Sequence, residues 1–239
     1  MQIKDKIKTR EENSMTKKYL SIAMLVLLGS GVIGVAHATI IDFEAPLPGG
    51  LSPMTYISGN PVPNSAVITD QYANLGIVFQ NVALVNLGYG HAPSGVNGLG
   101  NIDSNGNLDY GTPMTFTFVS PLDGITTGVT DYFSVTTDNW GWGGNTIILS
   151  AFAVDGTMIG STSYTEGAGG VSPQLQNLGL FHTVVVDWNY NGTSGIGLDL
   201  LTFGDVSASP VPEPGTIALL GLGLIGLGGI RKKFKSCNS

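Results

Sequence analysis

Hydrophobic and polar positions alternate over short runs in the middle of the chain, whereas long apolar runs lie towards its two ends. Met114, Phe116 and Phe118 alternate with Thr115 and Thr117, which is the period of a half-buried β-strand. Clusters of Gly, Asn, Thr and Ser separate such runs, and no helical period extends beyond a few residues. The pattern predicts strands at about 39–44, 65–69, 75–80, 82–87, 113–119, 128–135, 146–154, 157–164, 182–189 and 196–203.

The predicted strands fall within residues 39–209, a length that suits one domain. Asp155-Gly156 separates two of them, and this dipeptide is a strong signal for a β-hairpin turn. Many short strands without helices predict an all-β fold, namely a two-sheet antiparallel β-sandwich or jelly roll.

The apolar run near the N-terminus has the layout of a signal peptide. Two lysines precede the run, and Ala36-His37-Ala38 follows it as an A-x-A cleavage site. We expect residues 1–38 to be a leader and signal peptide, with Met15 rather than Met1 as the suspected start. An N-terminal anchor helix is the alternative.

The second apolar run spans Thr216–Ile230 and, as a helix, would be about 22 Å long. This is short for a hydrocarbon core about 30 Å thick. Val211-Pro212-Glu213-Pro214 precedes the run and should be extended, because proline cannot continue a helix backwards. Four basic residues at 231–235 follow, which places the C-terminal side in the cytoplasm. A permanent tail anchor and a buried core helix are the alternatives.

These three pieces, taken in order over residues 210–235, resemble the PEP-CTERM sorting signal of Gram-negative bacteria. The resemblance implies export, transient membrane anchoring, and removal of the span by an exosortase-like membrane protease. It also implies a place at the cell surface or in the extracellular matrix, with exopolysaccharide and biofilm. Residues 40–44, 72–79 and 197–203 look like segments common in PEP-CTERM ectodomains, which are similar to carbohydrate-binding jelly rolls.

The domain at 39–209 contains no lysine or arginine, because all ten basic residues lie before Thr39 or after Ile230. Thirteen of the 17 acidic residues lie inside it, the other four being Asp5, Glu11, Glu12 and Glu213. A net charge of about −13 excludes nucleic-acid binding, since nothing could neutralise phosphates. An anionic polysaccharide would be repelled unless divalent cations bridged the two.

The domain has few of the residues that usually bind zinc. The only cysteine, Cys237, lies in the tail, so no disulfide can stabilise the domain. Only His91 and His182 remain after the leader, which excludes a three-histidine zinc site.

An acidic group composed of Asp42, Glu44 and Asp199 is the first candidate for a metal site. By strict alternation, Asp199 shares a strand face with Leu201 and Phe203, where a carboxylate is costly unless it is paired or bound to a cation. The first and last strands often lie together in a sandwich. The sequence therefore predicts a structural Ca²⁺ at Asp42, Glu44 and Asp199, with hydrogen-bonded acids at strand ends as the alternative.

A second acidic stretch is the reserve candidate for calcium. Asp103, Asn105, Asn107 and Asp109 place oxygen atoms at alternate positions, as calcium loops do. The EF-hand spacing fails because Leu108 stands where glycine is required. A turn before the next strand is the alternative.

Trp140 and Trp142 lie in a Gly/Asn-rich loop and form the candidate ligand-binding site. Flat indole faces exposed on such a loop could stack against sugar rings. The alternatives are a loop that folds back over both rings and a surface for a protein partner. Trp188, within a predicted strand, is expected in the core.

For catalysis the signals are poor: there is no G-x-S-x-G sequence, and the domain at 39–209 has no lysine or arginine to hold an oxyanion or phosphate. We therefore expect a non-enzymatic surface or matrix protein that binds exopolysaccharide or is embedded in it. A purely structural, self-associating matrix or coat protein is the first alternative. An enzyme on a jelly-roll scaffold, such as a polysaccharide lyase or glycosidase, is the second.

Overall fold

A computed structural model describes residues 37–88, 90–137, 145–165, 172–189 and 197–209. The chain divides into two compact units, at 1–36 and 37–239, and all described residues belong to the second. Among the described residues, no helix is long and apolar enough to cross a membrane. The predicted signal peptide up to Ala36 and the sorting segment at 210–235 lie outside the described residues.

The larger sheet contains short strands in the order β13-β10-β15-β6-β5-β2. Three further strands join its sides: β1 pairs with β15, β3 with β5, and β7 with β6. The bounds are β1 Thr39–Ile41, β2 Met54–Thr55, β3 Val67–Ile68, β5 Val82–Asn86, β6 Asn97–Ile102, β7 Leu108–Asp109, β10 Phe133–Thr137, β13 Gln174–Leu175 and β15 Leu198–Phe203.

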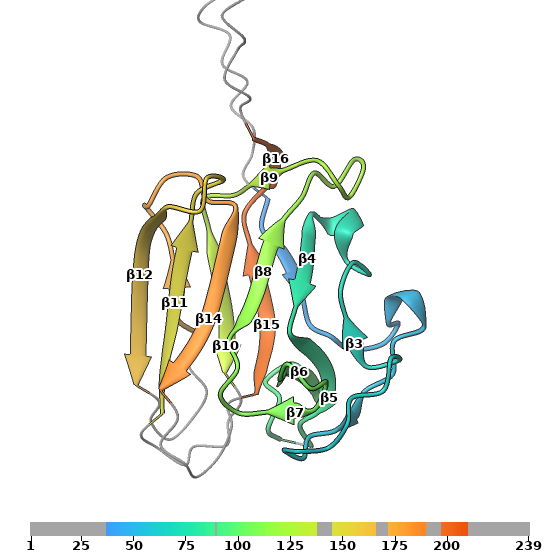
Figure 1. The fold of residues 1–239 in the computed structure, drawn as a ribbon. Coiled ribbons are helices and arrows are strands. Elements are labelled where there is room, and N and C mark those ends of the chain that lie inside the picture. Colours follow the sequence, from blue (N-terminus) through green and yellow to red (C-terminus); the bar gives the residue numbers. More distant parts are fainter. Residues whose placement is uncertain (1–36, 89, 138–144, 166–171, 190–196, 210–239) are drawn as a thin grey trace, which may run out of the picture. The chain divides into compact units, whose positions relative to one another are not determined.

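The second sheet has the order β12-β11-β14-β8-β4 and lies face to face with the first (Figure 1). A separate pair, β16 with β9, closes one end of the domain. The remaining bounds are β4 Ile77–Gln80, β8 Met114–Phe118, β9 Gly128–Val129, β11 Thr146–Phe152, β12 Met158–Thr165, β14 Thr183–Asn189 and β16 Ser207–Ala208, with 3-10 turns η1 at Pro48–Gly50 and η2 at Ala73–Leu75.

The core lies between the two sheets because alternate residues of their strands point inwards. Met114, Phe116 and Phe118 of β8 are fully buried, as the alternation predicted. Phe116 meets Phe133 of the opposite sheet with ring centroids 5.4 Å apart, and Phe118 meets Phe203 at 5.5 Å. The prediction of a two-sheet β-sandwich is therefore confirmed. One pair, β2 with β5, is parallel and departs from the predicted antiparallel arrangement.

The strand β6 was not predicted, although all six of its residues are buried. Its sequence, Asn-Gly-Leu-Gly-Asn-Ile, resembles a loop, but the glycines are required by close packing. A Cβ at Gly98 would lie 2.5 Å from both the carbonyl oxygen of Leu198 and a methyl group of Leu87. The predicted strand at 128–135 was also wrong in part, because it is divided into β9 and β10.

The turn between β11 and β12 forms as predicted. The amide of Ala153 donates to the carbonyl of Thr157 at 2.8 Å, and the Asp155 carboxylate accepts from the amide of Thr157 at 2.9 Å. Gly156 has φ +82°, a conformation that side chains disfavour.

The first and last long strands are neighbours, which was the condition for bringing the predicted metal ligands together. β1 pairs antiparallel with β15, and Thr39 lies opposite Phe203. The predicted strand at 39–44 nevertheless ends at Ile41, and Phe43 has φ +58°. This bend turns Asp42 and Glu44 towards the segment that leads into β6.

Candidate functional site

Because residues 37–209 contain no lysine or arginine, their carboxylates accept hydrogen bonds from peptide, hydroxyl and amide groups instead. Most of these bonds are local and hold turns of the chain. For the acids other than Asp42, Glu44 and Asp199, the backbone N–H donors belong to Asn105 and Asn107 for Asp103, Gly111 and Thr112 for Asp109, Ile125 and Thr126 for Asp123, Thr157 for Asp155, Trp188 for Asp187 and His37 for Asp205.

Asp199 is the exception, since its side chain is fully buried and its main partner is distant in sequence. Ser94 donates its backbone N–H to one carboxylate oxygen at 2.7 Å and its hydroxyl to the other at 2.8 Å. The amide of Leu200 donates a third bond at 2.7 Å. A buried carboxylate without an ion pair is therefore satisfied by three donors.

Glu44 holds the residues that follow Ser94. One of its carboxylate oxygens accepts from the amides of Val96 and Asn97, at 2.7 and 2.8 Å. The other accepts from the side-chain amide of Asn97 at 3.0 Å. These bonds fix the chain at the point where it enters β6.

Asp42 completes the group through its backbone. Its carbonyl oxygen lies 2.9 Å from the hydroxyl oxygen of Ser94 and shares the single hydroxyl proton with the Asp199 carboxylate. Its carboxylate accepts from the amide of Glu44 at 3.1 Å. We call Asp42, Glu44 and Asp199 the acidic clamp, because all three form hydrogen bonds to the segment from Ser94 to Asn97.

The electrostatics of the acidic clamp oppose the charge on Asp199. Burial, and to a lesser extent the negative charge of Glu44, raise the pKa of Asp199, while the hydrogen bonds from Ser94 and Leu200 lower it; the net shift is upward. The neighbouring Tyr72 responds as well: burial, followed by the charge of Asp42, raises the pKa of its phenol to about 12. The clamp is thus a place where negative charge is costly.

The three acids predicted to bind calcium thus meet at the segment from Ser94 to Asn97. Their partners there are hydrogen-bond donors of the protein. Among the described residues, no three His, Cys, Asp or Glu side chains are grouped as a metal site requires. The expectation that Asp199 shares a face with Leu201 and Phe203 was wrong. Leu200 has φ +41°, which breaks the alternation, so Leu198 packs in the core cluster with Leu201 and Phe203. Calcium binding itself stays a prediction.

The reserve candidates, Asp103 and Asp109, each organise a turn. The Asp103 carboxylate accepts from the amides of Asn105 and Asn107 at 2.8 and 2.9 Å, within the connection from β6 to β7. The bond from Asn107, ahead of the others, lowers the pKa of Asp103. Burial acts to raise the pKa of Asp109, but bonds led by that from the Thr112 side chain outweigh it and lower the pKa. The turn interpretation fits these contacts.

Buried amide and indole groups hold the segment that crosses from β7 to β8. Asn101, fully buried on β6, donates to the carbonyl of Thr112 at 2.6 Å. The indole of Trp188 donates to the carbonyl of Tyr110, and Trp188 is buried, as expected. Sequence reasoning missed Ser94, Asn97 and Asn101, because small polar residues in a Gly/Asn-rich stretch resemble an ordinary loop.

Several predicted site residues lie outside the part of the chain that the structure describes. They are the two tryptophans of the candidate ligand site, the first cleavage residue and the sorting motif: Trp140, Trp142, Ala36, Val211, Pro212, Glu213 and Pro214. Ala38, the residue before the predicted cleavage point, is described and is exposed just ahead of β1.

Comparison with known proteins identifies the C-terminal segment. A family model for the PEP-CTERM protein-sorting motif matches residues 210–233. The motif indicates a protein that is exported, sorted by an exosortase and transiently anchored in the membrane through this segment. No curated protein matches the chain.

One solved structure that resembles the chain is described as a DUF4465 family protein from Bacteroides caccae. It shares 14% sequence identity, and the alignment covers 70% of this chain and 98% of that one with a TM-score of 0.45. A similarity of this size establishes neither a common fold nor a common function.

Proposed function

We propose that the chain is the precursor of a non-enzymatic protein of the cell surface or extracellular matrix, which an exosortase-like protease processes and which associates with exopolysaccharide. The match of residues 210–233 to the sorting motif carries this proposal. The resemblance of that motif to signals found with exopolysaccharide systems supports the polysaccharide as partner.

The charge of the domain restricts which polysaccharide could bind. With about −13 charges and no basic residue at 39–209, the domain repels anionic polymers unless a divalent cation joins the two. A neutral glycan needs no such bridge. From the sequence, we expect Trp140 and Trp142 to be the aromatic residues on which such a glycan would stack.

Binding of the mature protein to exopolysaccharide from the producing bacterium tests the partner, with and without EDTA. We expect Trp140→Ala and Trp142→Ala to weaken retention several-fold. Tyr164→Ala is the matched control, because Tyr164 is an aromatic residue exposed by 48% on β12. Equal retention of all three variants would remove the tryptophans from the proposal, and no retention of the parent protein would remove the polysaccharide.

The non-enzymatic part of the proposal is supported by the lack of catalytic sequence signals. Incubation of the mature protein with the same polysaccharide, followed by sizing of the polymer, tests it. We expect no change in chain length. Release of oligosaccharides that is proportional to protein concentration would establish the alternative of a lyase or glycosidase.

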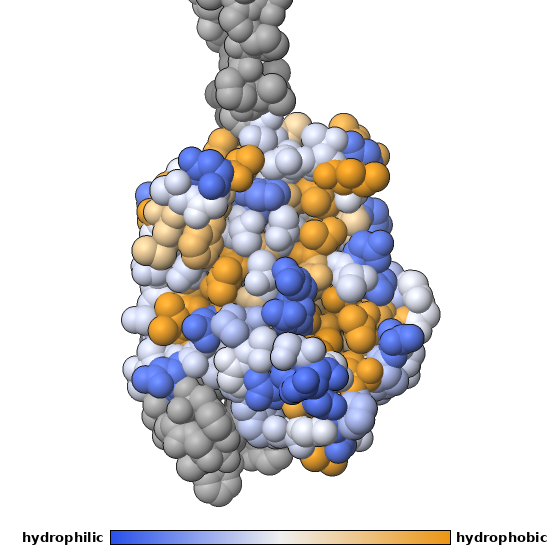
Figure 2. Space-filling view, viewed as in Figure 1, coloured by the Kyte–Doolittle hydropathy of each residue, from blue (hydrophilic) through white to orange (hydrophobic). Residues whose placement is uncertain are grey.

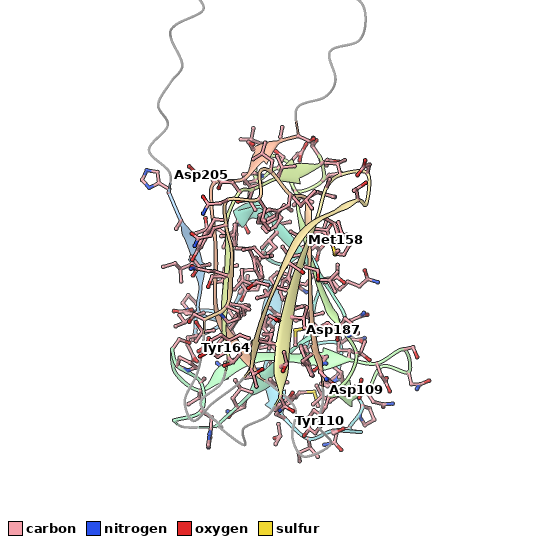
Figure 3. All side chains as sticks on the ribbon, turned by 90° about the vertical axis from the view of Figure 1, so that its left-hand side faces the viewer. Asp109, Tyr110, Met158, Tyr164, Asp187 and Asp205 are labelled. Carbon is pink, nitrogen blue, oxygen red and sulfur yellow. The ribbon has the colours of Figure 1, made fainter. Side chains whose placement is uncertain are left out.

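Self-association is the second candidate function, and β12 favours it. β12 forms one edge of the second sheet, and among the described residues no strand pairs with its outer side. The whole of Met158–Thr165 contains no charged residue and no proline, which are the usual means of blocking an exposed edge. Figure 3 looks towards this edge, which runs between Met158 and Tyr164.

An antiparallel partner strand from a second copy would continue the sheet. Two-fold pairing about Ser161 places the Ser161 residues of the two copies directly opposite each other. Sedimentation over a range of concentrations tests this. Ser161→Asp brings two added charges together at the centre of the pairing and should abolish the dimer, whereas Ser58→Asp, at an exposed position elsewhere, should not. A monomer at all concentrations contradicts the candidate.

A further inference from the structure

The end of the sandwich from which the chain continues to the sorting segment is built from several connections. Ser209, the last described residue, donates its amide to the carbonyl of Thr127 at 2.9 Å. Thr127 closes the loop from β8 to β9, since it bridges to Val119. We call this the exit end: the start of β1, η2, the β8–β9 loop, the β11–β12 turn, the residues before β14, and β16.

Contacts among these connections show that they share one end. His182, just before β14, accepts or donates a hydrogen bond at 2.8 Å between its Nδ1 and the carbonyl of Gly128 in β9. Its amide donates to the carbonyl of Phe152 at the end of β11. The amide of Val119 donates to the carbonyl of Gly76, just after η2. Figure 3 places Asp205 and Met158 towards this end, with Asp109 and Tyr110 at the other.

Exposed apolar side chains gather at the exit end. Leu122 and Ile125, in the β8–β9 loop, are 96% and 84% exposed. Figure 2 shows hydrophobic atoms over this loop. Among the described residues, all but two of the large exposed apolar side chains lie at this end, the exceptions being Ile57 and Tyr164; those at the end are Ile40, Leu75, Leu122, Ile125, Val154, Met158 and Leu180.

The one charged residue of the β8–β9 loop, Asp123, forms its hydrogen bonds within the loop. The carboxylate of Asp123 accepts from the amides of Ile125 and Thr126 at 3.0 and 2.9 Å, and from the hydroxyl of Thr126. The amide of Gly124 closes the loop on the carbonyl of Ser120 at 2.7 Å. These bonds stay within the loop, and Asp123 is itself exposed between Leu122 and Ile125, the two residues that we call the tip of the loop.

The distance from this tip to the membrane-entering segment is limited by the chain. The apolar run begins at Thr216, seven residues after Ser209, and a fully extended chain advances at most about 3.3–3.6 Å per residue. While the apolar run is in the bilayer, Ser209 therefore lies within roughly 25 Å of the start of the span. Thr127, two residues beyond Ile125, is hydrogen-bonded to that same Ser209.

We propose that the exit end rests on the lipid surface before the sorting segment is cleaved, with Leu122 and Ile125 inserted among the headgroups of zwitterionic lipids. This inference rests on the proposed function, because the bilayer is the one that the sorting segment enters. Transfer of aliphatic side chains from water to the membrane interface lowers the free energy. The domain has no basic residue to attract anionic lipid, so zwitterionic headgroups are the partner that its charge allows.

The contact orients the precursor during processing. With the exit end on the lipid, the opposite end of the sandwich, where Asp109 and Tyr110 lie, faces away from the membrane (Figure 3). Cleavage at the sorting motif removes the tether, and a contact of this small area does not hold the domain by itself.

Site-directed fluorescence on the full chain tests the lipid contact. Cys237→Ser is combined with a single cysteine at Leu122 or, as the control at the opposite end, at Ile57, and each is labelled with an environment-sensitive dye. The labelled chains are reconstituted into phosphatidylethanolamine–phosphatidylcholine vesicles that contain a lipid with a quencher near the headgroup. Ile125→Cys provides a second reporter if the label at 122 disturbs folding.

We expect every labelled chain to float with the vesicles, and the dyes at 122 and 125 to be quenched at least twofold more than the dye at 57. Phosphatidylglycerol should reduce this difference. Flotation with equal quenching at both ends overturns the lipid contact and leaves the proposed function standing. A failure to float overturns both. Protection of residue 122 only when an exosortase-like protease is present assigns the surface to that protein instead and overturns the lipid proposal.

Discussion

Ser94 donates both its backbone N–H and its hydroxyl to the carboxylate of Asp199, across 105 positions of the sequence. The pair joins the segment before β6 to the last long strand of the same sheet. In a domain without lysine or arginine, such bonds take the place of salt bridges. A carboxylate buried without these donors would carry its full desolvation cost.

Removal of the Ser94 hydroxyl should destabilise the domain. Ser94→Ala deletes the hydroxyl that the Asp199 carboxylate and the Asp42 carbonyl share, leaving the buried carboxylate short of a donor at a cost of about 1–3 kcal/mol. A domain of this size loses roughly 2–4 °C of Tm per kcal/mol. Calorimetry of the mature domain measures the change, with Ser52→Ala, at an exposed position, as control. Equal midpoints for the two variants would show that the clamp is not a stabilising element.

Two aspartate-to-asparagine changes should respond to pH in opposite directions. The pKa of Asp199 is raised by folding, so its contribution to stability is full below its ordinary value of about 3.9 and declines as pH rises through the folded pKa. The pKa of Asp103 is lowered, so its contribution is full above about 3.9 and is lost as pH falls through the folded pKa.

Urea unfolding of both variants between pH 3 and pH 7 tests these signs. The stability of Asp199→Asn relative to the parent protein should increase as pH rises, because the variant has no buried carboxyl group to ionise. The stability of Asp103→Asn relative to the parent protein should decrease over the same range, because the variant lacks the carboxylate charge that the surrounding hydrogen bonds stabilise. Parallel trends for the two variants would contradict the assigned environments.

Calcium and protein donors give opposite expectations for the acidic clamp. The observed bonds already direct amide, hydroxyl and side-chain N–H groups at Glu44 and Asp199, so they predict the same Tm in EDTA and in millimolar calcium. A structural ion would instead raise the Tm in calcium. At a free calcium concentration of one hundred times the dissociation constant, it would add about 2.7 kcal/mol to the free energy of unfolding. A rise that Asp199→Asn abolishes and Asp103→Asn retains would establish calcium at the clamp.

Gly98 should tolerate no side chain. A Cβ there would lie 2.5 Å from the Leu198 carbonyl oxygen and from a Leu87 methyl group, and overpacking of this kind costs about 1–3 kcal/mol. Gly98→Ala should therefore lower the midpoint of urea unfolding. Gly111→Ala is the matched control, since its nearest contact, to the Asp109 carboxylate, is an ordinary 3.7 Å. Equal midpoints would contradict the close packing of β6.

Much of the fold follows from local sequence patterns. β8 alternates strictly between apolar residues and threonine, and the Asp155-Gly156 turn joins β11 to β12 as predicted. β6 could not be predicted, because Gly98 and Gly100 are required by neighbours far away in the sequence. The bend at Leu200 likewise depends on tertiary contacts, and it moves Asp199 off the face that simple alternation assigns.

The candidate site was predictable in its acids but not in its partners. Asp42, Glu44 and Asp199 stand out as acids in or next to strands, and the pairing of β1 with β15 brings them towards one segment. Ser94 and Asn97 carry no local signal. Their role follows only from the spatial meeting of three strands in a domain that has no cationic side chains.

The C-terminal segment is expected to be a sorting signal that is removed on the way to the surface. The match at residues 210–233 supports it, and the order of Val-Pro-Glu-Pro, apolar run and basic cluster agrees with it. Mass spectrometry of the protein recovered from the cell surface or the medium measures it most directly. We predict peptides that end within Val211–Pro214 and none beyond this region. Recovery of surface-located protein with an intact C-terminal segment, including Lys235, would contradict the account.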